Sequence, residues 1–179
     1  FRSAAYMETL IDDLKLTYQL ENGLLPVNRE HQNIVRFLKE LAIDILNTPE
    51  YEDRVIGFDS TEDAIFYSFD PKLLTRAFRN LIINAFVHGG ETAEVTLRLS
   101  RIDGALLIQA ADTGKGIGPE EAEHLFDRYY RGTGTGEKPE GSGLGLAIAK
   151  SIIELHGGTI SAYGSPGAGT VLSIEFPVS

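Results

Sequence analysis

The fold is decided by the stretch DPKLLTRAFRNLIINAFVHGG at residues 70–90. Asp70 followed by Pro71 is typical of a helix N-terminus, because the carboxylate caps free backbone N–H groups and proline fits the first helical position. Apolar residues then recur at spacings of three and four, which predicts one buried helix face: Leu74, Ala77, Phe78, Leu81, Ile82 and Ala85. Gly89 and Gly90 end the predicted helix.

Two asparagines, Asn80 and Asn84, lie four residues apart on this helix and therefore project from one face. Asparagine is a weak helix former that prefers caps and turns, so this pair needs a reason. One interpretation is that both are simply exposed polar positions. The other is that the Asn84 side-chain oxygen is a ligand for Mg²⁺, which takes its remaining ligands from water and phosphates.

The segments around this helix alternate between helical and strand patterns. We predict further helices at 3–21, 34–46 and 144–156, and short strands at 54–59, 64–69, 95–100, 105–111, 159–163 and 170–176. This order predicts an α+β fold, a two-layer α/β sandwich in which one mixed sheet carries helices on one face. A separate helix precedes the domain.

That first helix carries a single apolar stripe, formed by Met7, Leu10, Ile11, Leu14 and Tyr18. Gly23 and Pro26 end it. An isolated helix of this length is marginally stable in water, so the stripe needs a partner. The partner is either the rest of this domain or a helical bundle outside the chain.

Three glycine-rich segments follow the central helix: DTGKGIG at 112–118, GSGLGL at 141–146 and GAGT at 167–170. Asp112 ends a predicted strand, where its carboxylate can accept a hydrogen bond from an exocyclic amine. Backbone N–H groups at the helix start after residue 141 suit a phosphate. The loop at 132–140 is expected to close over a ligand as a lid. Taken alone, each segment also fits an ordinary turn or surface loop.

Composition narrows the function classes. Lys and Arg number 16 against 26 Asp and Glu, which gives a net charge of −10 and argues against a nucleic-acid partner. Cysteine is absent, which excludes disulfides, zinc–thiolate sites and cysteine nucleophiles. No apolar run reaches the roughly 20 residues of a membrane span. Because Phe1 is not an initiator, we expect a fragment of a longer protein that is not itself membrane-embedded.

Read together in order, these motifs make the chain resemble the catalytic ATP-binding domain of bacterial sensor histidine kinases, in the superfamily shared with DNA gyrase. The matching segments are the N box at 79–88, the G1 box at 112–118, the F box HLFDRYYR at 124–131, the G2 box at 141–146 and the final Gly-x-Gly-Thr at 167–170. Residues 6–23 resemble the end of the second dimerisation helix. We therefore assign residues 1–23 to the C-terminal part of the dimerisation helix and 28–179 to the catalytic domain.

The resemblance implies ATP and Mg²⁺ as cofactors. Asn84 would ligate Mg²⁺, Asp112 would accept from the adenine amino group, and Arg131 would reach the γ-phosphate; Asn80, Asn84 and Arg131 are the implied catalytic residues. His88 would flank the base or cap its helix. The implied nucleotide-binding set is Asn80, Asn84, His88, Asp112, Gly114, Gly116, Gly118, Tyr130, Arg131, Gly141, Ser142, Gly143, Leu144, Gly145, Leu146 and Thr170.

Two departures from the family pattern bear on the activity. Val87 stands where many members carry Lys or Arg near the phosphates. Asn80 stands where the gyrase-like ATPases carry the Glu that activates water, and an amide cannot take that proton. The resemblance thus favours a protein-histidine kinase over a gyrase-type ATP-hydrolysing clamp. A pseudokinase that acts only as an interaction module is the other alternative.

The implied partners are the dimerisation domain of the same kinase, as a homodimer in the full protein, and the receiver domain of a response regulator. The implied location is the cytoplasmic side of a membrane-anchored parent. None of the four histidines, His31, His88, His124 and His156, is followed directly by the Glu or Asp typical of a phosphoacceptor helix. We therefore expect the acceptor histidine to lie outside this chain.

Overall fold

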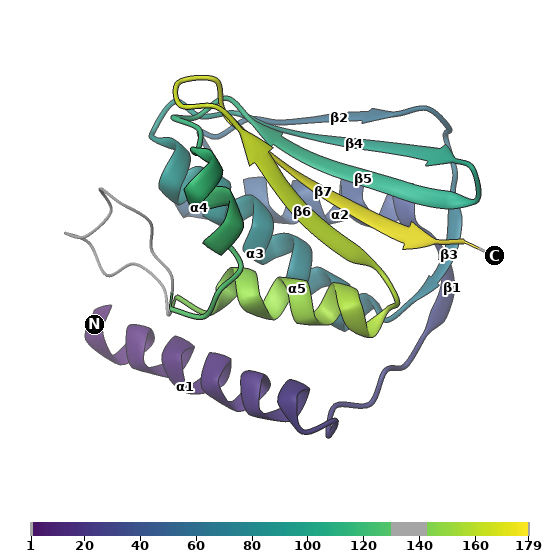
Figure 1. The fold of residues 1–179 in the computed structure, drawn as a ribbon, viewed down its shortest axis with the longest axis horizontal. Coiled ribbons are helices and arrows are strands. Elements are labelled where there is room, and N and C mark those ends of the chain that lie inside the picture. The colour runs from purple at the N-terminus through teal and green to yellow at the C-terminus, as the bar shows by residue number, and fades with distance from the viewer. Residues whose placement is uncertain (1, 130–142, 179) are drawn as a thin grey trace.

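The computed structural model of the protein describes residues 2–129 and 143–178. Figure 1 shows a twisted sheet with helices gathered against one of its faces. The elements in chain order are α1 (Arg2–Glu21), β1 (Glu30–Asn33), α2 (Ile34–Leu46), the 3-10 helix η1 (Pro49–Tyr51), β2 (Ile56–Ser60), β3 (Phe66–Phe69), α3 (Pro71–Gly89), β4 (Val95–Ile102), β5 (Ala105–Asp112), α4 (Pro119–His124), α5 (Gly145–Leu155), β6 (Thr159–Gly164) and β7 (Thr170–Pro177).

The main sheet has five strands in the order β2-β4-β5-β7-β6. Its pairs are antiparallel except for β2 and β4, which run parallel, so the sheet is mixed. Alternate residues of the central strands are buried, and α3 and α5 pack side by side against that face (Figure 1). The predicted α+β sandwich is therefore confirmed. Asp70 also caps α3 as predicted, because its carboxylate accepts from two backbone N–H groups of the first turn.

The predicted strand at 64–69 does not join this sheet, and the prediction of one sheet is wrong in that respect. The strand β3 pairs instead with β1, in a separate two-stranded antiparallel sheet. The sequence of β1, EHQN, has no apolar alternation, so nothing in it predicted a strand. The Asn33 side chain joins the two strands to α2, because its oxygen accepts from Ile65 N and from Val35 N, each at 3.1 Å. His31 consequently lies in strand β1.

Helix α1 is present as predicted, but its apolar stripe faces away from the domain. Met7, Ile11, Leu14 and Tyr18 are all about half exposed or more, between 48% and 60%. Another face docks on the domain beside α5 (Figure 1), where Asp13 is buried and forms a 2.5 Å ion pair with Arg76 of α3. Four of the five stripe residues are therefore exposed, and Leu10 is half-buried. No helix in residues 2–129 and 143–178 is long and apolar enough to cross a bilayer.

The C-terminal end of α3 touches the loop after β5 through two glycines. A Cβ atom on Gly114 would lie 2.5 Å from the Gly89 Cα and 2.7 Å from the Gly89 carbonyl oxygen. No side chain fits at such distances, since folded interiors are close-packed. Gly118, four residues further on, has ordinary backbone angles and nothing within 4 Å of its would-be Cβ. The packing therefore requires a glycine at position 114 but not at position 118.

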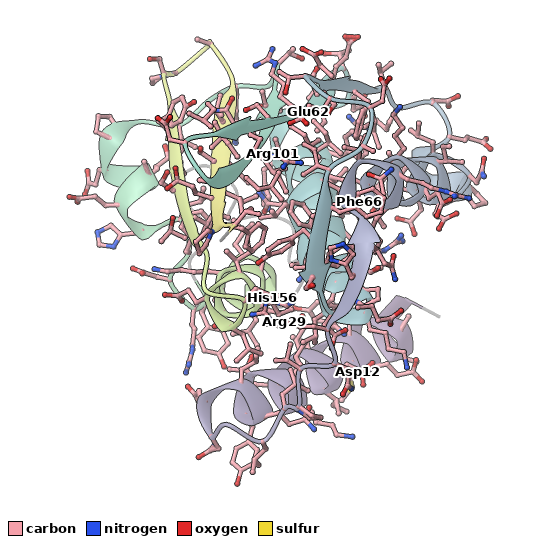
Figure 2. All side chains as sticks on the ribbon, turned by 90° about the vertical axis from the view of Figure 1, so that its right-hand side faces the viewer. Asp12, Arg29, Glu62, Phe66, Arg101 and His156 are labelled. Carbon is pink, nitrogen blue, oxygen red and sulfur yellow. The ribbon has the colours of Figure 1, made fainter. Side chains whose placement is uncertain are left out.

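His156 joins the C-terminal end of α5 to the start of α3. Its ring is almost fully buried; Nδ1 lies 2.8 Å from the Ile152 carbonyl oxygen and Nε2 lies 3.0 Å from the Asp70 backbone N. These partners fit the neutral ring with its proton on Nδ1, because Nε2 must then accept the Asp70 N–H. Burial is the main cause that lowers the pKa of His156 below 6.5, and the bond to Ile152 opposes it only in part. Figure 2 marks the position of His156 at the end of α5.

We expect Gly114→Ala to destabilise the protein by about 1–3 kcal/mol, since the added methyl group forces α3 and the loop apart. The matched control Gly118→Ala should change the free energy of unfolding by less than about 1 kcal/mol, because nothing packs against that position. Urea unfolding of both variants measures the difference. Equal stabilities for the two variants would contradict the contact between Gly89 and Gly114.

The free energy of unfolding should fall as the pH drops below about 6.5, the ordinary pKa of histidine. A buried neutral histidine with a lowered pKa contributes fully above that pH, and its contribution is lost as the pH falls through the folded-state pKa. Protonation would place a second N–H against the Asp70 N–H. His156→Gln should be less stable at neutral pH and should lose this slope, whereas the exposed control His31→Gln should keep it. Denaturant midpoints between pH 7.5 and 5.5 supply the comparison, and an identical slope in His156→Gln would refute this account.

Candidate functional site

Four segments that are far apart in the sequence meet at one end of the sheet. They are the C-terminal half of α3, the end of β5 with its following loop, the start of α5 and the start of β7. Strand register brings two of them together, because Asp112 at the end of β5 pairs with Thr170 at the start of β7. Helix packing brings the other two together, because α3 and α5 lie side by side. The described residues of the predicted N, G1 and G2 boxes and of the final Gly-x-Gly-Thr thus lie at the same end of the sheet.

Asp112 is a half-buried carboxylate held by backbone. Its Oδ1 atom accepts from Gly114 N at 2.9 Å and from Thr170 N at 3.3 Å. Burial raises the pKa of Asp112 above 3.8, and the two N–H groups offset this in part. Among the described residues only Oδ1 is bonded, so Oδ2 is available to a ligand donor. The structure thus places a fixed hydrogen-bond acceptor at the C-terminal end of β5.

Asn80 and Asn84 differ in what holds them. The Asn80 amide nitrogen donates to the carbonyl oxygen of Gly145, the first residue of α5, at 3.0 Å. This bond ties the N-box helix to the glycine-rich helix start. The half-buried Asn84 side chain makes no hydrogen bond to any described residue. Asn80 therefore organises the site, whereas the amide of Asn84 is open to a ligand.

The loop after β5 is anchored on both sides by backbone contacts. Thr113 N donates to the Glu94 carbonyl oxygen at 3.0 Å, and Thr113 Oγ1 accepts from Glu94 N at 2.9 Å. On the other side, Gly167 N donates to the Lys115 carbonyl oxygen at 2.6 Å. Gly116 has a φ of +76°, and a Cβ there would clash with the turn between β6 and β7. The loop is thus fixed between the α3–β4 connection and the β6–β7 turn.

The start of α5 is held against the segment that follows α4. Tyr129 N donates to the Gly143 carbonyl oxygen at 2.7 Å, and the Gly143 backbone lies directly against Tyr129. The Leu144 side chain is fully buried in the core, and Leu146 is half-buried against it. Leucine side chains so placed leave only the backbone of this turn to face a ligand. Of the predicted F box, His124 is the one helical residue in the described part of the chain, as the last residue of α4.

For the other predicted residues, the structure gives a position on an element, or they lie outside the described ranges. His88 lies in the last turn of α3, and Val87 beside it is 38% exposed. Gly118 precedes α4 and touches no residue through its would-be side chain. Four predicted residues lie outside the described residues: Tyr130, Arg131, Gly141 and Ser142. The predicted lid at 132–140 lies outside them as well.

The side-chain oxygen of Asn84 fits a magnesium ion that is held mainly by the phosphates of a nucleotide. No group of three or more His, Cys, Asp or Glu side chains that could hold a metal ion occurs within residues 2–129 and 143–178. A single amide oxygen cannot hold Mg²⁺ alone, but Mg²⁺ commonly keeps its waters and takes phosphate oxygens beside one or two protein ligands. The residues present therefore suit a metal that arrives with phosphates.

Sequence reasoning missed the part that Gly89 plays. Its contact with Gly114 sets the distance between α3 and the loop that carries Asp112. A glycine at the end of a helix is common and is usually explained as a cap, so nothing in the sequence distinguishes this one. Its role emerges only from the tertiary contact.

A comparison with protein-family models matches residues 69–179 to the histidine kinase-, DNA gyrase B- and HSP90-like ATPases. Among curated proteins, the chain is 40% identical over 171 residues to the sensor histidine kinase YvrG of Bacillus subtilis, which covers 96% of this chain and 30% of the relative. It is 32% identical over 176 residues to the sensor protein kinase WalK of Staphylococcus aureus, which covers 96% of this chain and 28% of the relative. The chain thus spans under a third of the length of these two relatives.

Solved structures share the fold. The histidine kinase AdeS of Acinetobacter baumannii has a TM-score of 0.80 at 19% identity, covering 99% of this chain and 81% of that one. Full-length ShkA in complex with AMPPNP has a TM-score of 0.83 at 23% identity, covering 99% of this chain and 37% of that one. The histidine kinase ThkA in complex with the response regulator protein TrrA has a TM-score of 0.74 at 17% identity, covering 97% and 49%.

These matches agree with the arrangement of the site. The family model spans α3, the β5 loop, α5 and β7, which are the elements that meet around Asp112 and Asn84. Its description names ATPases, which implies a nucleotide as the ligand. The extent of the match establishes that the chain belongs to the family of histidine kinase-, DNA gyrase B- and HSP90-like ATPases.

Proposed function

We propose that the chain is the catalytic part of a sensor histidine kinase, in which residues 28–179 bind Mg·ATP and residues 1–23 end the dimerisation helix. The observation that carries the proposal is the Asp112 carboxylate, whose Oδ1 is fixed by two backbone N–H groups while Oδ2 is available to a ligand. An ionised carboxylate is only an acceptor, and adenine offers an amino donor at C6. The named sensor kinases among the relatives support the same function.

The phosphates would lie between α3 and the start of α5. The first backbone N–H groups of α5 have no partner within the helix, and the helix dipole favours an anion there. Asn80 holds this helix start in place through Gly145. The Asn84 amide oxygen would contribute one ligand to Mg²⁺, which when bound neutralises charge on the transferred phosphoryl group. Phosphoryl transfer of this kind needs positioning and charge stabilisation more than covalent help from the protein.

Asn80 favours transfer over hydrolysis. A hydrolytic site needs a base that takes a proton from water, and the Asn80 amide instead donates a hydrogen bond to Gly145. A histidine acceptor needs no such base, since a neutral imidazole is already nucleophilic near pH 7. We therefore propose transfer of the γ-phosphoryl group to a histidine of the dimerisation domain, and from there to a response regulator. The complex of ThkA with TrrA supports that partner class.

Nucleotide selectivity tests the role of Asp112. ATP should bind at least about tenfold more tightly than GTP, because the guanine carbonyl would face the carboxylate and an unpaired polar contact costs on the order of 1.4 kcal/mol. In Asp112→Asn the two backbone donors hold the amide oxygen at Oδ1, so the NH₂ group faces the ligand and should weaken ATP binding and narrow the selectivity. The exposed control Asp44→Asn should change neither affinity. Calorimetric titrations of both nucleotides decide this; equal affinities in the unchanged protein would exclude Asp112 as the base contact.

Phosphoryl transfer tests the reaction. The chain alone should bind Mg·ATP without labelling itself, and it should label a histidine-bearing dimerisation domain supplied in trans. Asn84→Ala should lose most of this labelling, whereas Asn47→Ala at the end of α2 should retain it. Radiolabelled ATP and an acid-lability assay measure the transfer. Rapid release of inorganic phosphate without an acceptor would instead support the hydrolysing clamp, and ATP binding with neither reaction would support the pseudokinase.

A further inference from the structure

Arg54 clamps the C-terminal end of α3. Its Nη1 atom donates to the Gly90 carbonyl oxygen at 2.7 Å and its Nη2 atom donates to the Phe86 carbonyl oxygen at 3.1 Å. Its guanidinium carbon also lies 5.0 Å from the centroid of the Phe86 ring, within cation–π range. The last carbonyl groups of a helix lack partners within the helix, and a cation there complements the dipole. Arg54 thus supplies this helix end with two hydrogen-bond donors, a favourable positive charge and a contact with the Phe86 ring.

The two carbonyl groups that Arg54 binds bracket Gly89. Gly89 is the residue whose backbone lies against Gly114, and the Gly114 N–H in turn orients Asp112 Oδ1. A chain of direct contacts therefore runs from Arg54 through the end of α3 to the Asp112 carboxylate. Arg54 comes from the segment before β2, which contributes no residue to the predicted nucleotide-binding set. Its charge is engaged with carbonyl oxygens, so it does not replace the cation missing at Val87.

We propose that Arg54 is a positioning residue for base recognition: it fixes the end of α3 against Gly114 and thereby sets the Asp112 carboxylate. This inference rests on the proposed nucleotide site and extends it to a residue that does not touch the nucleotide. The planar guanidinium suits the task, because its two donors have a fixed separation. Lysine would keep the charge at the helix end and would lose the two-pronged geometry.

The test compares Arg54→Met, Arg54→Lys and a matched control. Arg54→Met keeps the apolar stem and removes the charge and both donors. Arg101→Met is the control, because Arg101 forms a half-exposed 3.4 Å ion pair with Glu62 at the opposite end of β4 (Figure 2). Calorimetry with ATP and with GTP, on the full chain, gives the affinities. Amide hydrogen exchange at Gly114 reports the contact without any nucleotide.

We expect Arg54→Met to weaken ATP binding by about fivefold or more and GTP binding by less, because only adenine uses the Asp112 acceptor. In transfer to a supplied dimerisation domain, the KM for ATP should rise while kcat stays within about twofold. The Gly114 amide should exchange faster in Arg54→Met, with Arg54→Lys in between and Arg101→Met unchanged. If Arg54→Met fails to fold, Arg54→Lys carries the same comparison.

Two results would overturn the proposal: an unchanged ratio of ATP to GTP affinity in the Arg54 variants, or Gly114 exchange that matches the unchanged protein. An equal loss for both nucleotides would mean general destabilisation, and this also overturns it. If the unchanged protein binds no ATP, the proposed function fails. Exchange at Gly114 then still decides whether Arg54 fixes the contact.

Discussion

The contact between Gly89 and Gly114 is the constraint on which the candidate site depends. It is made by backbone alone, so neither segment can approach more closely or tolerate an added carbon without displacement. α3 carries both asparagines, and the β5 loop carries the aspartate. Fixing the helix end against the loop therefore fixes the separation of the two groups of polar side chains. The hydrogen bond between Asn80 and Gly145 fixes the start of α5 against α3, so the positions of α3, the β5 loop and α5 depend on one another.

An anionic ligand would bind to a protein that is itself negatively charged. The chain has a net charge of −10. Three arginines on the elements around the site already have partners: Arg54 on the end of α3, Arg76 on Asp13 and Arg128 on Glu21. Backbone N–H groups at the start of α5 would therefore supply part of the positive charge that a bound nucleotide needs, beside the remaining cations of these elements.

The sequence predicted what local rules determine. The capped helix at 71–89, the hairpin of β4 and β5 and the final pair of strands all follow from spacing and turn residues, and all are present. The prediction that failed depended on a tertiary contact. β3 pairs with the polar segment 30–33, which has no strand pattern. The apolar stripe of α1 is mostly exposed, so of its two predicted partners the helical bundle outside the chain stays the open alternative. Asp112 was predicted from its place after a strand, whereas Gly89 and Arg54 are defined only by what they touch.

The junction around Asp70 limits how far the first helix can move from the rest of the protein. The backbone N–H of Asn28 donates to Asp70 Oδ2 at 2.9 Å, and the chain then enters β1, which is paired along its length with β3. Only residues 22–27 separate this anchor from the end of α1. Six residues span at most roughly 20 Å when fully extended. If α1 is released from its docking face, the remaining domain is on a short tether, and its swing about the helix end is confined to that radius.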